Sequence, residues 1–190
     1  MREKDINSII VSVFDDLKML ASSEPNERLP KEEQIRSCIF SVLRGKFQFL
    51  CVERGYQSID KGSSIECDLW ARKSKGAAQI WIECKRCWSG KNFNNKPTEQ
   101  LDDWLTDIKK LGAIGKTSER YFFLFGIFNC DPLVPEAREQ DNVVKNIFSI
   151  YPGRLIAKDS IRMQWPNGGD ITHSGAWVWC WPVGVNVEYQ

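Results

Sequence analysis

Asp68, Glu83 and Lys85 have the residue types and the spacing that phosphodiester hydrolysis needs. Fourteen residues separate the two carboxylates, and the lysine follows Glu83 by two positions. A pair of carboxylates suits a hard divalent cation such as Mg²⁺ or Mn²⁺, which keeps several waters and binds phosphate oxygens. An ammonium beside that cation is suited to orient or deprotonate the attacking water, or to stabilise charge on the phosphate. These residues predict a metal-dependent phosphodiester hydrolase.

The segments that carry these residues are predicted to form a β-hairpin. Residues 64–72 and 78–87 have the composition of strands, and the connection between them contains Gly76. If the turn centres just before this glycine, Asp68 lies directly opposite Glu83. Facing carboxylates repel each other at a cost of roughly 0.2 to 1 kcal/mol. A bound divalent cation is the simplest agent that offsets this cost.

The predicted register gives the hairpin two different faces. One face receives Glu66, Asp68, Trp70, Trp81, Glu83 and Lys85. The other receives Ile65, Cys67, Leu69, Ala71, Ala78, Ile80, Ile82 and Cys84. Because this second set is apolar, it is predicted to pack on helices. The alternative for the first face is an exposed surface without chemistry, on which Lys85 pairs with Glu66.

Helical and strand-like patterns surround the hairpin and predict an α/β (α+β) protein. The predicted helices cover residues 5–20, 30–43, 97–111 and 136–150, and the further strands cover residues 47–53, 121–128, 155–165 and 176–187. No linker interrupts the chain, so a single domain of 1–190 is predicted. Its parts are an N-terminal helix in 1–29, a core in 30–128 and an elaboration in 129–190.

Composition excludes several classes of protein. Hydrophobic residues make up 42% and charged residues 27% of the 190 residues, which is typical of a globular chain. The single histidine, His173, argues against HNH nucleases, phospholipase-D-like nucleases and histidine-rich zinc hydrolases. The apolar run Tyr121–Phe128 is far shorter than the ~20 residues of a membrane span, and residues 1–4 open no signal peptide. We therefore expect a cytoplasmic protein without membrane contact.

The cysteines and basic residues carry weaker signals. Cys84 and Cys87 have a Cys-x-x-Cys spacing, but no second Cys/His pair accompanies them, and a strand places their side chains on opposite faces. Lys75 and Arg86 belong to basic groups near the site in sequence, which makes them candidates for substrate binding. The alternative is a solvated surface, since the formal net charge is only +1.

The motif of Asp68 followed by Glu83-Cys84-Lys85 resembles the PD-(D/E)xK nuclease superfamily. The predicted order of elements is also similar to the αβββαβ core of these restriction-endonuclease-like proteins. The resemblance covers about Pro30 to Phe128, and it departs from the family pattern where Cys67 precedes the aspartate in place of proline. It implies a mixed central sheet, an extra N-terminal helix and additional C-terminal strands.

The resemblance also implies roles for individual residues. Asp68 and Glu83 would be metal ligands, the main-chain carbonyl of Cys84 a further ligand, and Lys85 the catalytic lysine. Of the helix carboxylates Glu32 and Glu33, Glu33 is favoured as another ligand; the alternative is a solvated residue that benefits from the helix dipole. Gln100 and Trp104 would lie near the phosphate or an end base. The metal would be Mg²⁺ or Mn²⁺, and the substrate DNA in preference to RNA.

Two other functions remain open at this stage. The chain could be an inactive nuclease-fold module that binds nucleic acid or a protein partner, or an immunity or scaffold protein that uses its Trp-rich tail as an interface. The intact triplet of Asp68, Glu83 and Lys85 favours the enzyme. The tail tryptophans 177, 179 and 181 are better interpreted as core than as a base-stacking face. A homodimer is a further partner that the sequence leaves open.

Overall fold

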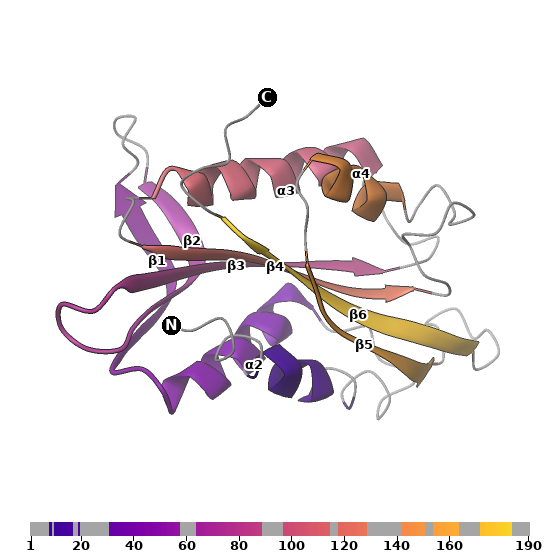
Figure 1. Ribbon diagram of the computed structural model, residues 1–190, viewed down its shortest axis with the longest axis horizontal. Helices are drawn as coiled ribbons and strands as arrows, with labels where there is room; N and C mark the ends of the chain where they lie inside the picture. The colour runs from indigo at the N-terminus through magenta and orange to yellow at the C-terminus, as the bar shows by residue number, and fades with distance from the viewer. Residues whose placement is uncertain are drawn as a thin grey trace.

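The computed structural model describes residues 31–57, 64–88, 97–114, 118–128, 142–150, 154–163 and 172–183, together with residues 8, 10–16 and 19. The elements are α2 (Glu32–Arg44), β1 (Phe49–Gln57), β2 (Ser64–Arg72), β3 (Gln79–Trp88), α3 (Pro97–Gly112), β4 (Glu119–Phe128), α4 (Asn142–Ile150), β5 (Arg154–Met163) and β6 (Thr172–Pro182). Residues 8, 10–16 and 19 are helical and precede α2. Figure 1 shows this order along the chain. The predicted succession of helices and strands is confirmed.

The strands form one mixed sheet. Its six strands are ordered β1-β2-β3-β4-β6-β5. Among the strands that the structure describes, only β3 and β4 pair in parallel, and α3 provides the crossover that a parallel pair requires. The strands β6 and β5 continue the sheet beyond β4, so the C-terminal strands are part of the same sheet as the predicted core. The prediction of a mixed α+β architecture is therefore confirmed.

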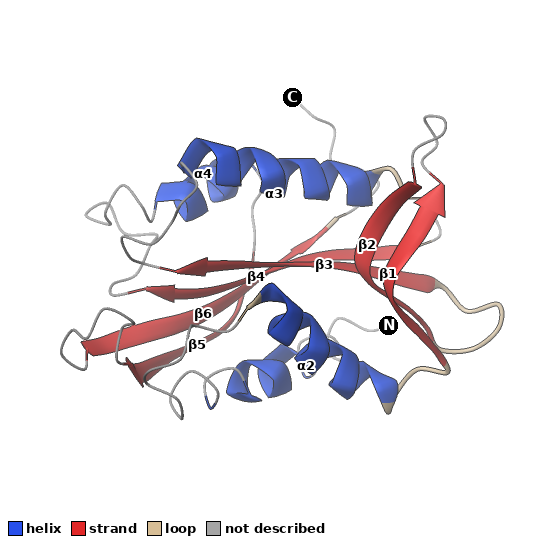
Figure 2. Cartoon of the chain, turned by 180° about the vertical axis from the view of Figure 1, so that it is seen from behind, coloured by secondary structure: helices blue, strands red, loops and turns tan. Residues whose placement is uncertain are grey.

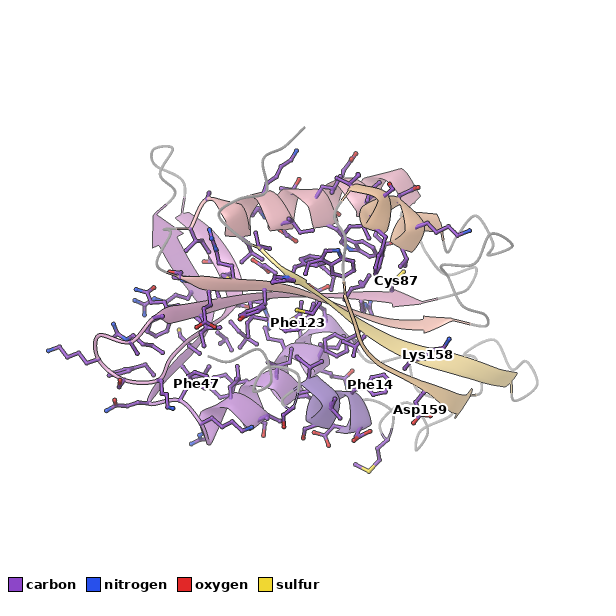
Figure 3. All side chains as sticks on the ribbon, in the orientation of Figure 1. Phe14, Phe47, Cys87, Phe123, Lys158 and Asp159 are labelled. Atoms are coloured by element: carbon purple, nitrogen blue, oxygen red, sulfur yellow. The ribbon has the colours of Figure 1, made fainter. Side chains whose placement is uncertain are left out.

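Helices cover both faces of the sheet. Figures 1 and 2 show α2 and the N-terminal helical residues on one side, and α3 and α4 on the other. Two buried clusters follow from this arrangement. The α2-side cluster includes Phe14, Ile39, Leu69, Ile82, Cys84 and Phe123, and the α3-side cluster includes Cys67, Trp70, Trp81, Cys87, Trp104 and Phe122. Phe14 and Phe123 are labelled on the first side in Figure 3, and Cys87 on the second.

Helix α2 follows from an apolar stripe and a side-chain cap. Ile35, Ile39 and Leu43 recur at intervals of four and are buried against the sheet. At the start of the helix, the main-chain N–H of Lys31 donates to Oε1 of Gln34 at 2.7 Å. The first turn also carries two glutamates, which the positive end of the helix dipole favours. The stripe fixes which side of α2 faces the sheet.

The hairpin of β2 and β3 has the predicted register between Arg72 with Gln79 and Leu69 with Ile82, but the predicted pairing of Asp68 with Glu83 is not among its pairs. Trp70 lies opposite Trp81, and the turn contains Gly76 at a φ of +87°. The pairing ends at Leu69 and Ile82, although β2 begins at residue 64 and β3 continues to residue 88. Figure 2 shows β1 and β2 running steeply across the direction of β3 and β4. Followed away from the turn, the two strands therefore separate just before they reach Asp68 and Glu83.

An irregularity between β1 and β2 changes which residues share a face. Pairing passes from Val52 with Leu69 to Arg54 with Cys67, and the intervening residue Glu53 has a φ of +49°. A non-glycine residue in this left-handed region is uncommon and marks a local distortion of the strand, although the register is the same on both sides of it. Cys67 lies in the α3-side cluster. This corrects its predicted place on the opposite face, because alternation does not persist through the distortion.

Other boundaries and faces also differ from the prediction. Ala78 is exposed at the turn, where it was expected in the apolar layer, and Trp70 and Trp81 are buried because α3 covers their face. In the tail, Trp181 is buried. The side chains of residues 177 and 179 lie outside the described residues, as do residues 136–141, which were predicted as helix, and 184–187, which were predicted as strand. Among the helices that the structure describes, none is long and apolar enough to cross a membrane.

Candidate functional site

Asp68 lies where β2 and β3 separate, and its carboxylate replaces part of the missing strand pairing. The main-chain N–H of Cys84 donates to Oδ2 of Asp68 at 2.8 Å. The Nη1 of Arg36, on α2, donates to Oδ1 at 3.3 Å. Both oxygens are therefore held by donors from neighbouring elements. Hydrogen bonds to the charged form of a carboxylate stabilise its negative charge.

Glu83 is the buried partner of Asp68. Its side chain is on β3, and the residue is only 4% exposed. Burial first, and then the charge of Asp68 and a hydrogen bond to it, raise the pKa of Glu83 to about 9. Two adjacent carboxylates cannot both ionise cheaply in a buried place. Without a cation, Glu83 therefore keeps its proton at neutral pH.

Lys85 is held between two carboxylates from different helices. Its Nζ lies 3.2 Å from Oε1 of Glu32 on α2 and 3.1 Å from Oδ2 of Asp107 on α3. Burial by itself would lower the pKa of Lys85, but the charges of Glu32 and Asp107 outweigh it and raise that pKa above its usual range. The lysine is therefore a cation across the physiological pH range.

Asp107 is a site residue that sequence reasoning missed. It is 8% exposed and also accepts a hydrogen bond from Nζ of Lys110 at 2.8 Å. It stands on the same side of α3 as Trp104, Ile108 and Leu111, which are buried. The signal was a carboxylate inside an apolar stripe at helical spacing. Its position beside Lys85 depends on how α3 crosses the sheet, which no local pattern shows.

The helix carboxylate at the site is Glu32 and not Glu33. Glu32 contacts Lys85, and burial raises its pKa even though the lysine opposes the shift. Glu33 is exposed, and its main-chain carbonyl accepts a hydrogen bond from Oγ of Ser37. The preference for Glu33 is therefore corrected. Neighbouring positions on a helix point about 100° apart, so only one of the two faces the sheet.

Arg36 connects Asp68 to Glu53, the residue at which β1 is distorted. Its Nη1 lies 3.0 Å from Oε1 of Glu53 and 3.3 Å from Oδ1 of Asp68. The residue with the unusual backbone conformation is thus linked through one guanidinium to a carboxylate of the site. This arrangement restricts the orientation of Asp68 from the α2 side.

The predicted substrate-binding residues differ in how exposed they are. Trp104 is 2% exposed within the α3-side cluster, so its predicted contact with substrate is corrected to a packing role. Gln100, one turn earlier, is partly exposed. Lys75 is exposed in the hairpin turn, and Arg86 is half-buried, with its charge acting on Glu32.

The alternatives without chemistry can also be compared with the contacts. The expected surface pair of Lys85 with Glu66 is not the one observed, because the lysine contacts Glu32 and Asp107 while Glu66 is exposed. Cys84 and Cys87 belong to the α2-side and α3-side clusters respectively, as strand alternation predicted. Neither forms a disulfide, and their predicted placement on opposite faces of the sheet is confirmed.

The carboxylate pair fits a magnesium-like cation by its chemistry. Among the described residues, no group of three or more His, Cys, Asp or Glu side chains is arranged to hold a metal ion. Mg²⁺, however, takes one or two protein carboxylates and completes its shell with water and phosphate oxygens. Asp68 and the buried Glu83 supply two adjacent hard oxygen donors, and a cation would replace the proton that they share.

Comparison with known proteins leaves the chain without an assigned family. Neither protein-family models, nor curated proteins, nor solved structures give a match to it.

Proposed function

We propose that the protein is a metal-dependent nuclease that hydrolyses phosphodiester bonds, with DNA favoured over RNA, and that its core is of the restriction-endonuclease-like PD-(D/E)xK type. The observation that carries the proposal is the gathering of Asp68, Glu83 and Lys85 where β2 and β3 separate. The order α2, β1, β2, β3, α3, β4 and the parallel pairing of β3 with β4 support the proposed core. A cytoplasmic location fits this function.

Asp68 and Glu83 would hold the cation, Mg²⁺ or Mn²⁺. When bound, the cation would polarise the phosphate and lower the pKa of a water molecule. Glu83 would give up its proton on binding, which makes it a stronger ligand. The N–H of Cys84 points toward Asp68, and the N–H and C=O of a strand residue point to the same neighbouring strand. The Cys84 carbonyl would therefore face the same gap and be available as a further ligand.

Lys85 would act as a cation and not as a base. A lysine that abstracts a proton must be neutral first, and the two carboxylates beside Lys85 oppose its deprotonation. The ammonium is therefore suited to donate to a phosphate oxygen and to stabilise the negative charge that grows there. Of the roles that the sequence left open, stabilisation of the phosphate is the one that these contacts favour.

A second candidate function is a nuclease-like module that binds nucleic acid or a protein without cutting. The near-neutral net charge of +1 is the observation that favours it. The complete set of Asp68, Glu83 and Lys85 favours the enzyme, because binding alone does not require a buried carboxylate pair beside a lysine.

The test is cleavage by the purified full-length chain. Plasmid, linear duplex and single-stranded DNA, and RNA, are incubated with Mg²⁺, Mn²⁺ or EDTA. Cleavage is expected with either metal, and its loss is expected in EDTA and in Asp68→Asn and Glu83→Gln. The control is Glu33→Gln, an exposed change on α2 that should cleave like the parent. Equal cleavage with EDTA, or by the two site variants, would refute the proposal.

A further inference from the structure

Two arginines on the β1–β2 ribbon lie over the ring of Trp70. The guanidinium carbon of Arg54 is 4.7 Å from the centroid of that ring, and that of Arg72 is 5.5 Å away. Arg72 also lies 4.8 Å from the ring centroid of Phe49. A guanidinium stacked in this way uses its flat face, while its N–H donors remain on the edge. Each arginine is thereby held in place with its Nη donors still available.

These donors lack acceptors, in contrast to the basic residues around the site. Within the described part of the chain, neither Arg54 nor Arg72 forms an ion pair or a hydrogen bond, and the Nε of Arg72 is shielded from solvent without a partner. Arg36, Lys85 and Lys110 are each paired with carboxylates. The Nη groups of Arg54 and Arg72 are therefore the donors that remain for an anion.

The backbone distortion at Glu53 lies beside the candidate site and places this arrangement next to it. Arg54 pairs with Cys67, the residue before Asp68, and the irregular backbone turns its side chain onto the face of Trp70. Arg72 is four residues beyond Asp68 on β2. At about 3.3 Å per residue these four positions span about 13 Å, or roughly four base-pair steps of a duplex.

We propose that Arg54 and Arg72 form a binding surface for the phosphate backbone of a nucleic acid, on the phosphates that flank the one at Asp68 and Glu83. The position of the cut phosphate in this statement rests on the proposed function. Arginine suits the task because its planar fork donates two hydrogen bonds to one phosphate. Contacts of this kind set register and orientation but read no sequence.

The salt dependence of binding provides the test. Binding of labelled duplex DNA to full-length protein is measured by fluorescence anisotropy in EDTA, in the Lys85→Ala background, across about 50 to 200 mM salt. Arg54→Gln and Arg72→Gln should each reduce the slope of log K against log salt by about 0.9, the value for one phosphate contact. Each should also weaken binding by about tenfold, as expected when one charge-assisted hydrogen bond is lost.

Matched variants distinguish arginines that contact phosphate from arginines that only pack on the ring of Trp70. Arg44→Gln makes the same chemical change at an exposed position of α2, on the other face of the sheet, and should leave the slope unchanged. Arg54→Lys and Arg72→Lys retain the charge, so they should keep the slope while losing affinity. They also keep the test valid if a glutamine variant does not fold. Equal slopes in the parent, the glutamine variants and the Arg44→Gln control would overturn the proposal.

The outcome is independent of catalysis. If the parent binds DNA through both arginines but cuts no substrate with Mg²⁺ or Mn²⁺, the binding surface stands and the nuclease function fails. If the parent cuts DNA while the arginine variants bind it with unchanged salt dependence, the function stands and the binding surface fails. If the protein binds neither duplex nor single-stranded DNA nor RNA at low salt, the binding surface is refuted outright.

Discussion

The ammonium of Lys85 lies 3.1 Å from Oδ2 of Asp107, although the two residues stand on different elements, β3 and α3. Because α3 is the crossover between the parallel strands β3 and β4, its path across the sheet brings this aspartate over the lysine. Glu32 approaches the same ammonium from the helix on the opposite face. A lysine in the middle of a sheet is thus oriented from both helical layers.

If Lys85 acts on the phosphate and Asp107 only orients Lys85, substitutions of the two residues should have different kinetic effects. Lys85→Ala should lower cleavage by about 100-fold or more while Mn²⁺ binding persists. Asp107→Asn should lower kcat by about 10- to 100-fold, as for other residues that orient a catalytic group, with little change in KM. Asp103→Asn, an exposed change on the same helix, is the control. Wild-type kcat in Asp107→Asn would contradict the positioning role.

The raised pKa of Glu83 predicts how the metal-free protein responds to pH. The folded protein holds this proton up to a pKa of about 9, whereas the ordinary value is 4.5. In that window the native state binds more protons than the unfolded state, so the free energy of unfolding should fall as pH rises. Glu83→Gln lacks this proton and should lose less stability. Urea unfolding in EDTA at about pH 5 and about pH 8 measures the difference.

The same experiment distinguishes the two carboxylates. Asp68 accepts hydrogen bonds from Cys84 and Arg36, so Asp68→Asn should destabilise the metal-free protein at neutral pH more than Glu83→Gln does. A parent and a Glu83→Gln variant with identical pH profiles would show that Glu83 is ionised in the folded state. The assignment of the shared proton would then be wrong.

Glu32 and Glu33 offer an internal comparison of adjacent residues. Glu32→Gln removes a charge that contacts Lys85 and should lower cleavage, or Mn²⁺ affinity, by about 10- to 100-fold. Glu33→Gln changes an exposed side chain and should leave both within about twofold. Cleavage assays and calorimetric Mn²⁺ titration provide the two measurements. A larger effect at Glu33 would place the helix carboxylate at the position that the sequence favoured.

The positive φ of Glu53 predicts opposite responses at two exposed glutamates. A β-branched residue is strained at a φ of +49°, so Glu53→Val should destabilise by about 1 to 2 kcal/mol relative to Glu53→Gly. Glu66 is exposed in β2, where Gly should be the less stable choice by about 0.5 to 1 kcal/mol relative to a residue with a Cβ. Thermal unfolding of the four variants measures this. The same order at both sites would contradict the left-handed conformation of Glu53.

Local patterns in the sequence determined the elements and the hairpin register. The stripe of Ile35, Ile39 and Leu43 defines the buried side of α2, and alternation around a glycine turn predicts that Trp70 faces Trp81. These features depend on the period of a helix or a strand, which neighbouring residues express by themselves. The type and order of the elements could be predicted from these patterns. The observed boundaries of the strands in the tail differ from the predicted ones by several residues.

Tertiary structure decided which residues complete the site. Glu32 and Lys85 are 53 residues apart, and their contact depends on how α2 packs on the sheet. Asp107 reaches the site through the crossing of α3, and Cys67 and Arg54 depart from strand alternation on either side of the distortion at Glu53. No repeating pattern in the sequence reveals these contacts, because each is set by the packing of one element against another. The sequence thus determined which side chains could perform the chemistry, and the packing of two helices on opposite faces decided which of them meet.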